Sequence, residues 1–206
     1  LVMCDHGNHS VARLNANFSK TFLVSVYKGK RLNSPTDLVI KSNGDIYFTD
    51  PPYGLKGLEN SPVKELDFNG VYLLRKSGEL VLLTKEFSKP NGIALSPDEK
   101  TLYVAQSDGK VPVIKSFAIK ADGTVEKSKL FFDSTPLRIE GRKRAHDGLA
   151  VDVHGNLWVT GPGGVIVLTS KGEHLGTILT GNPTANCTFG GVDGNVLYIT
   201  SQKYLF

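Results

Sequence analysis

The sequence predicts an all-β protein of the β-propeller class. A strand–turn–strand unit recurs four times along the 206 residues, and a polar residue stands just before the first strand of each unit. An aromatic residue in the second strand sets the period, because Tyr47, Tyr103, Trp158 and Tyr198 follow one another at intervals of 56, 55 and 40 residues. These intervals bracket the ~40 to 50 residues of one four-stranded blade, so they predict a radial array of blades.

Each unit consists of two short apolar runs joined by a turn and followed by a second hairpin. The turn of the first unit is Ser42-Asn43-Gly44, and its second hairpin is expected at 70–75 and 79–84. Short alternating runs bounded by Gly, Asn, Asp and Pro are strand and turn signals, and no stretch shows a sustained helical period. Complete blades are predicted at 36–85, 92–132 and 147–179, with partial blades at 1–25 and 186–206.

The first strand of each unit is short, apolar and rich in Gly and Ala, as expected for the innermost strand of a blade, where bulky side chains do not fit. The polar residues before these strands should then converge on one mouth of the central channel. Their oxygen atoms suit a hard divalent cation such as Ca²⁺, whereas Zn²⁺ prefers Cys and His, which form no cluster by spacing here. The predicted metal ligands are Thr36, Asn91, Asp147 and Asn186.

Several longer motifs lie at 33–38, 46–55, 64–72, 89–94, 147–152 and 186–191. Together they resemble one enzyme family, the gluconolactonase branch of the senescence-marker protein, gluconolactonase and luciferin-regenerating enzyme superfamily. The resemblance implies a six-bladed propeller with one catalytic divalent cation, either Ca²⁺ or another ion such as Mg²⁺, Mn²⁺ or Zn²⁺, held by a Glu of the first blade, Asn side chains and an Asp. Asn91 and Asp147 match two central ligands, and Asp147 also matches the general base or nucleophile.

Two features depart from the family pattern. Thr36-Asp37 stands where gluconolactonases have Asn-Asp, so a hydroxyl replaces an amide ligand. A six-bladed ring also needs roughly 240 to 300 residues. We therefore expect residues 1–206 to form a single propeller domain that lacks the first blade, an incomplete ring of about four to five blades. Whether the active site is intact stays open.

The predicted activity is the metal-dependent opening of a small-molecule sugar lactone, in which the cation polarises the carbonyl and Asp147 helps to deprotonate water. Two alternatives stay open. A phosphotriesterase-type hydrolase would use the same ligands with Asp147 as the nucleophile, and a propeller can also be a binding module without catalysis. A condensing enzyme like strictosidine synthase is disfavoured, because metal-type ligands recur.

Three further residues are candidates for substrate binding. His146 precedes Asp147 and could move a proton, although a solvent-facing loop histidine is the commoner case. His6 lies in a segment that resembles one near the active-site face of the family. Arg144 belongs to a basic run in the connection before Asp147, which is either a solvated loop or a surface that attracts an acidic substrate.

Composition excludes several classes of protein. The chain is 40% apolar and 21% charged, with a net charge of +4, and no run approaches the ~18 apolar residues of a membrane helix. It carries no nucleic-acid-binding signature, and two cysteines cannot build a disulfide framework. We expect a soluble protein of the cytoplasm or periplasm, with no nucleic-acid or membrane partner. The sequence does not predict its oligomeric state.

Overall fold

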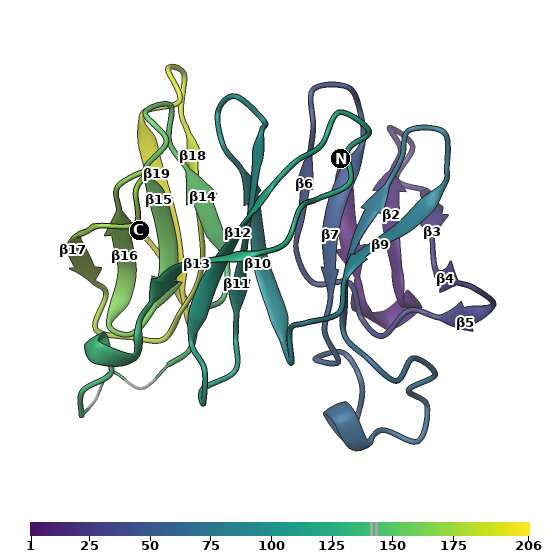
Figure 1. The fold of residues 1–206 in the computed structure, drawn as a ribbon, viewed down its shortest axis with the longest axis horizontal. Helices are drawn as coiled ribbons and strands as arrows, with labels where there is room; N and C mark the ends of the chain where they lie inside the picture. Colours follow the sequence, from purple (N-terminus) through teal and green to yellow (C-terminus); the bar gives the residue numbers. More distant parts are fainter. Residues whose placement is uncertain (141, 143) are drawn as a thin grey trace. The chain divides into compact units, whose positions relative to one another are not determined.

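The structure is a computed structural model that describes residues 1–140, 142 and 144–206 (Figure 1). Its contacts divide the chain into two compact units, residues 1–90 and 91–206, and each is described by itself. The all-β prediction is confirmed, because antiparallel sheets dominate both units and the described helices are three short 3₁₀ turns, η1 (His6–Asn8), η2 (Leu58–Asn60) and η3 (Thr135–Leu137). That 1–206 forms a single propeller domain stays a prediction.

The first unit contains a three-stranded and a four-stranded meander, joined by a small hairpin. Its core includes Val11, Leu32, Phe48 and Tyr72, and the rings of Phe48 and Tyr72 stack with centroids 5.2 Å apart. The strands are β1 (Val2–Asp5), β2 (Ser10–Leu14), β3 (Lys20–Val24), β4 (Val26–Tyr27), β5 (Lys30–Arg31), β6 (Leu38–Ile40), β7 (Ile46–Asp50), β8 (Gly70–Leu74) and β9 (Leu80–Thr84).

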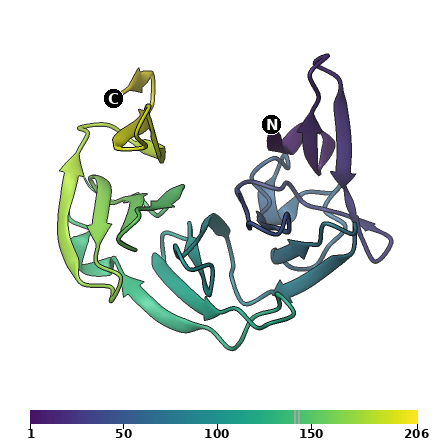
Figure 2. The same cartoon turned by 90° about the horizontal axis from the view of Figure 1, so that it is seen from above.

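The second unit contains two four-stranded meanders and a three-stranded one, each running strand by strand in chain order (Figure 2). The predicted hairpins therefore form, and the sheet boundaries fall within a few residues of the predicted blades. The strands are β10 (Pro90–Leu95), β11 (Thr101–Gln106), β12 (Val113–Ala118), β13 (Lys129–Asp133), β14 (Leu149–Val151), β15 (Leu157–Gly161), β16 (Gly164–Leu168), β17 (His174–Leu179), β18 (Thr184–Gly190), β19 (Val196–Ser201) and β20 (Tyr204–Leu205).

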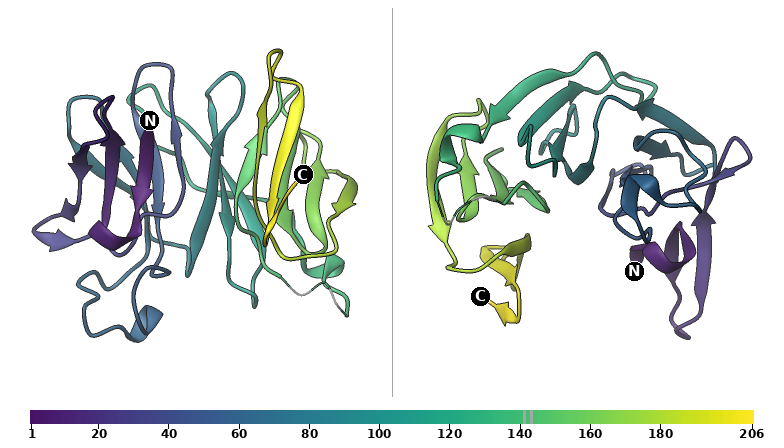
Figure 3. Two further views of the ribbon diagram at one scale, coloured as in Figure 1. Left: turned by 180° about the vertical axis from the view of Figure 1, so that it is seen from behind. Right: turned by 90° about the horizontal axis from the view of Figure 1, so that it is seen from below.

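Apolar side chains hold the sheets of the second unit against one another. Ala94 and Tyr103 of one sheet pack with Leu149 and Leu157 of the next. Strands β14 and β15 in turn lie beside β18 (Figure 3), where Cys187 belongs to a further apolar cluster. The first strands of consecutive sheets are thereby brought close enough to share a site.

Across the residues that the structure describes, no helix has the length and apolar character needed to cross a membrane.

Candidate active site

Asn91 and Asp147 are joined through the backbone that carries them. Asn91 lies in β10 and Asp147 stands just before β14. The amide of Gly92 donates to the carbonyl oxygen of Asp147 at 3.0 Å, and a Cβ on Gly92 would lie only 2.3 Å from that oxygen. A side chain at position 92 would therefore force the two strands apart. The Asn91 side chain hydrogen-bonds the Asp147 carboxyl group.

Asn186 reaches the same place from the third sheet of the unit. The amide of Gly148 donates to the carbonyl of Ala185 at 2.8 Å. A Cβ on Gly148 would lie 2.1 Å from Oδ1 of Asn186, so the Asn186 amide group rests directly on the Gly148 backbone, one residue from Asp147. Three oxygen-bearing side chains, from Asn91, Asp147 and Asn186, thus gather in the second unit.

The hydrogen bonds correct the predicted position of Asn186 in the repeat. The amides of Gly92 and Gly148 each donate to a carbonyl of the next sheet, that of Asp147 and that of Ala185. Asn91, Asp147 and Ala185 therefore occupy equivalent positions in successive sheets. Asn186 is instead the counterpart of Gly148, one residue later and inside β18. A register shift between Thr184 and Asn186 accompanies this offset.

Thr160, at the end of β15, fixes the backbone on which these side chains stand. Its hydroxyl donates to the carbonyls of Gly148 at 3.0 Å and Ala185 at 3.3 Å, and its carbonyl accepts the amide of Asp147 at 3.4 Å. The sequence analysis did not single out Thr160. A signal was present, because threonine recurs at the matching place in the repeat, at Thr49 and Thr200.

Thr49 and Thr200 bind the backbone in the same way as each other. The hydroxyl of Thr49 contacts the amide and carbonyl of Asp37, and that of Thr200 contacts the amide and carbonyl of Asn186. Oδ1 of Asp37 and of Asn186 each accepts the amide of the following residue, at 3.0 and 2.8 Å. Asp37, which the sequence analysis passed over, is therefore the counterpart of Asn186 in the first unit.

His146 is fully buried, which contradicts the alternative of a solvent-facing loop histidine. Its Nδ1 lies 3.1 Å from the carbonyl of Thr160, and within the described residues Nε2 has no hydrogen-bond partner. Burial lowers the pKa of His146 to about 4, although the Thr160 and Pro112 carbonyls nearby oppose this. The imidazole is therefore neutral at neutral pH, with the proton on Nδ1 donated to Thr160.

Burial also raises the pKa of the Asp147 carboxyl group, while Arg144 and the hydrogen bond from Asn91 act in the opposite direction. Arg144 is exposed. A half-buried carboxylate whose charge is not fully compensated favours a nearby cation. Asp147 is thus the electrostatic centre of the group.

Thr36 and His6, the two candidates in the first unit, lie together. His6 Nε2 is 3.1 Å from Oγ1 of Thr36, and that hydroxyl donates to the carbonyl of Ser34 at 3.0 Å. Burial lowers the pKa of His6. The pair forms a local polar contact in its own unit.

The donor atoms of the second unit fit a hard cation better than a soft one. No group of three or more His, Cys, Asp or Glu side chains suited to a metal occurs among the described residues, so a cation at this place would rely on the Asp147 carboxylate and the Asn91 and Asn186 amide oxygens. Such oxygens are typical Ca²⁺ ligands. The half-buried Asp147 carboxylate, whose charge Arg144 and Asn91 compensate only in part, fits the same cation.

Comparison with known proteins places the chain in one family. The chain is 38% identical to a gluconolactonase from Zymomonas mobilis over 97% of its length, and spans 57% of that protein. It is 31% identical to lactonase drp35 from Staphylococcus aureus, over 69% of the chain and 41% of that protein.

Solved structures agree with this placement. A gluconolactonase from Xanthomonas campestris matches 99% of the chain and 66% of its own length, with 38% identity and a TM-score of 0.85. This match confirms the predicted β-propeller class, and the five blade-like sheets among the described residues agree with the predicted four to five blades. The family model of the SMP-30/Gluconolactonase/LRE-like region matches residues 1–203, and the chain belongs to that family.

Proposed function

We propose that the chain takes part in the metal-dependent hydrolysis of a sugar lactone. One observation carries the proposal: the Asn91 side chain hydrogen-bonds the Asp147 carboxyl group, and the Asn186 amide group, from the next sheet, lies against Gly148, the residue after Asp147. The 38% identity to a gluconolactonase supports the same reaction. The chain spans little more than half of that relative, so the activity is proposed for the protein of which this chain forms a part.

The chemistry follows from the oxygen donors. A divalent cation held by Asn91, Asp147 and Asn186 would polarise the lactone carbonyl. Asp147 accepts the proton of the attacking water, and burial, which raises the pKa of this carboxyl group, makes it a stronger base than an exposed aspartate. Asn91 orients the carboxylate through its side-chain hydrogen bond.

The remaining candidates take supporting roles in this proposal. His146 and Thr160 position Asp147 through the shared Thr160 carbonyl. Arg144 meets the substrate, since its charge already acts on Asp147. The roles of Thr36 as a metal ligand and of His6 in substrate binding stay predictions from the sequence.

The test is substrate choice together with metal dependence. We expect glucono-δ-lactone to be opened at a rate that falls on chelation and returns with Ca²⁺, and a fluorophosphate to be turned over much more slowly. Preferred turnover of the fluorophosphate would assign the phosphotriesterase reaction instead. Binding of Ca²⁺ without turnover of either substrate would favour a binding module.

A further inference from the structure

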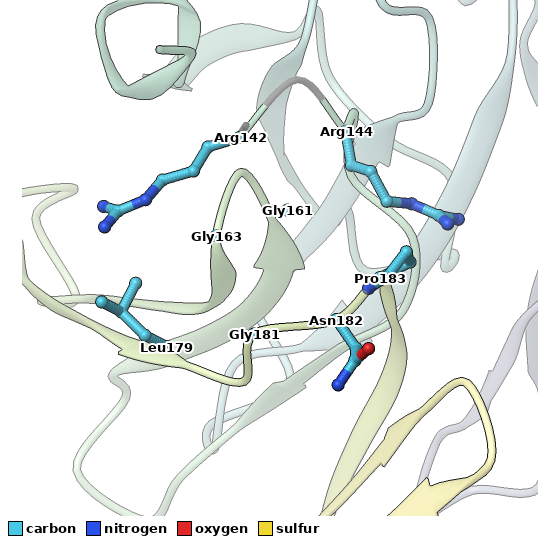
Figure 4. A pocket seen from close by; sticks show the side chains of 8 residues that line it. All are labelled: Arg142, Arg144, Gly161, Gly163, Leu179, Gly181, Asn182 and Pro183. Atoms are coloured by element: carbon cyan, nitrogen blue, oxygen red, sulfur yellow. The ribbon is translucent and has the colours of Figure 1, made fainter. Parts of the chain in front are cut away.

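A pocket of about 230 Å³ lies beside the candidate active site in the second unit. Its walls are the turn that joins β15 to β16, the connection from β17 to β18, and Arg142 and Arg144 of the connection before Asp147 (Figure 4). Sites for drug-sized ligands begin at about 300 Å³. This pocket therefore suits a small polar ligand or one end of a longer one.

The pocket shares residues with the surroundings of Asp147. Gly161 lines it, and a Cβ on Gly161 would lie 2.9 Å from Nδ1 of His146. The His146 ring therefore lies immediately behind Gly161, and Asp147 follows His146 in the chain. Arg144 lines the pocket and also acts on the Asp147 carboxyl group. A charged ligand in the pocket would therefore meet the arginine whose charge also acts on Asp147.

The charged residues that line the pocket are all positive. Two arginines line it and no acidic residue does, in the part of the chain that the structure describes. Both side chains are exposed, and among the described residues neither guanidinium group has an ion-pair partner. The two side chains point in opposite directions, one on each side of the turn that carries Gly161 and Gly163 (Figure 4). Such a pocket attracts an anion, and an arginine of its lining can reorient to form a bidentate contact with it.

We propose that this pocket binds the anionic group, a carboxylate or phosphate, of an acidic sugar lactone, with Arg144 as its direct partner and Arg142 as a second attracting charge. The inference rests on the proposed lactonase reaction and names its substrate class: a sugar lactone that carries a negative charge away from the ring carbonyl. The guanidinium group forms charge-assisted hydrogen bonds to the anionic oxygens and holds the carbonyl over Asp147.

The kinetic test compares neutral and anionic lactones. For 6-phosphoglucono-δ-lactone and glucaro-1,4-lactone we expect kcat/KM to exceed that for glucono-δ-lactone by about 10- to 100-fold, the range of one hydrogen bond to a charged group. Arg144→Gln should remove most of this preference and Arg142→Gln a smaller part. The matched control is Arg13→Gln, which removes the same charge from the first unit and should keep the preference. An Arg144→Gln variant that keeps the preference overturns the proposal.

A binding measurement separates this inference from the reaction itself. Calorimetric titration of Asp147→Asn with glucose 6-phosphate, glucuronate and glucose needs no turnover. We expect the two anions to bind and glucose not to, with binding weakened by Arg144→Gln and by added salt. Binding without lactone hydrolysis would retain the pocket and remove the lactonase proposal. Hydrolysis of neutral lactones with no anion binding would retain the reaction and overturn the pocket. The stronger of the two anions identifies the group as phosphate or carboxylate.

Discussion

Asp147 combines burial, a hydrogen bond from Asn91 and the charge of Arg144 in one carboxyl group. Asp147→Asn keeps an oxygen of similar position but removes the base. We expect turnover of a sugar lactone to fall by roughly 10² to 10⁴, the usual cost of losing a general base. Excess Ca²⁺ should recover only the part of the loss that comes from weaker metal binding. Turnover close to wild type at saturating metal would show that Asp147 is a structural turn residue.

The matched variant is Asn91→Ala. It removes an amide oxygen and leaves the carboxylate, so its defect should lie mainly in Ca²⁺ affinity, measured by calorimetric titration. A loss of turnover that saturating Ca²⁺ does not restore would instead assign Asn91 to the chemical step.

Thr160 acts on the site through its hydrogen bonds to the backbone. Thr160→Val keeps the shape of the side chain but leaves the carbonyls of Gly148 and Ala185 without the hydroxyl donor. Both carbonyls keep a backbone amide donor, from Thr160 and from Gly148, so the loss is that of the hydroxyl hydrogen bonds, about 0.5 to 1.5 kcal/mol each, and we expect it in urea unfolding together with weaker Ca²⁺ binding. Thr101→Val is the control, since no hydroxyl hydrogen bond of Thr101 occurs within the described residues. Equal effects of the two changes would refute the role of Thr160.

Gly148, just before β14, has no room for a side chain. A Cβ at Gly148 would overlap Oδ1 of Asn186 at 2.1 Å, so Gly148→Ala must displace the Asn186 amide group. We expect weaker Ca²⁺ binding and a lower free energy of unfolding. Gly176→Ala, in β17, places its Cβ in open space and should change neither by more than a few tenths of a kcal/mol. Unchanged Ca²⁺ affinity in Gly148→Ala would remove Asn186 from the ligand set.

Strand order and blade boundaries were predictable because apolar runs and turn residues repeat, as the sheet at β6–β9 within the predicted 36–85 shows. The position of Asn186 within its strand could not be predicted, because an apolar run looks the same in the sequence when it is shifted by one residue. A bulge near Thr184 produces that shift. The burial of His146 could not be predicted from the sequence either. Its neighbours in the sequence, Arg144 and Asp147, are polar, and the sheet that covers its ring comes from elsewhere in the chain.

The stability of the second unit should depend on acid through His146. Burial lowers the pKa of His146 to about 4, against about 6.5 for an exposed imidazole. Between those values the unfolded chain binds a proton that the folded chain excludes, so stability is fully present above pH 6.5 and declines as the pH falls to about 4. The loss is about 3 kcal/mol. Trp158 is the single tryptophan and lies in this unit, so its fluorescence during urea unfolding measures the decline, which His146→Gln should flatten.

The first unit should respond to pH in the opposite direction. Burial raises the pKa of Asp50 to about 7, although amide donors from Asn33 and Ser34 oppose this. The folded carboxyl group keeps its proton where the unfolded one releases it, so this contribution to stability is lost as the pH rises from about 4 to about 7. Amide hydrogen exchange at Asn33 and Ser34 would detect it. Faster exchange at pH 4.5 than at pH 7, after correction for intrinsic rates, would contradict the assignment.

The threonine that ends the second strand of a sheet has a consequence for how such proteins diversify. The hydroxyls of Thr160, Thr49 and Thr200 bond to main-chain atoms of neighbouring segments, so these contacts do not depend on the side chains that those segments carry. Thr36, Asn91 and Asp147 occupy one equivalent position with three different chemistries. Beside Thr36 and Asp147 the scaffold therefore buffers mutation: a duplicated gene can exchange the side chain at that position, and with it the chemistry offered to a ligand, without first giving up its fold.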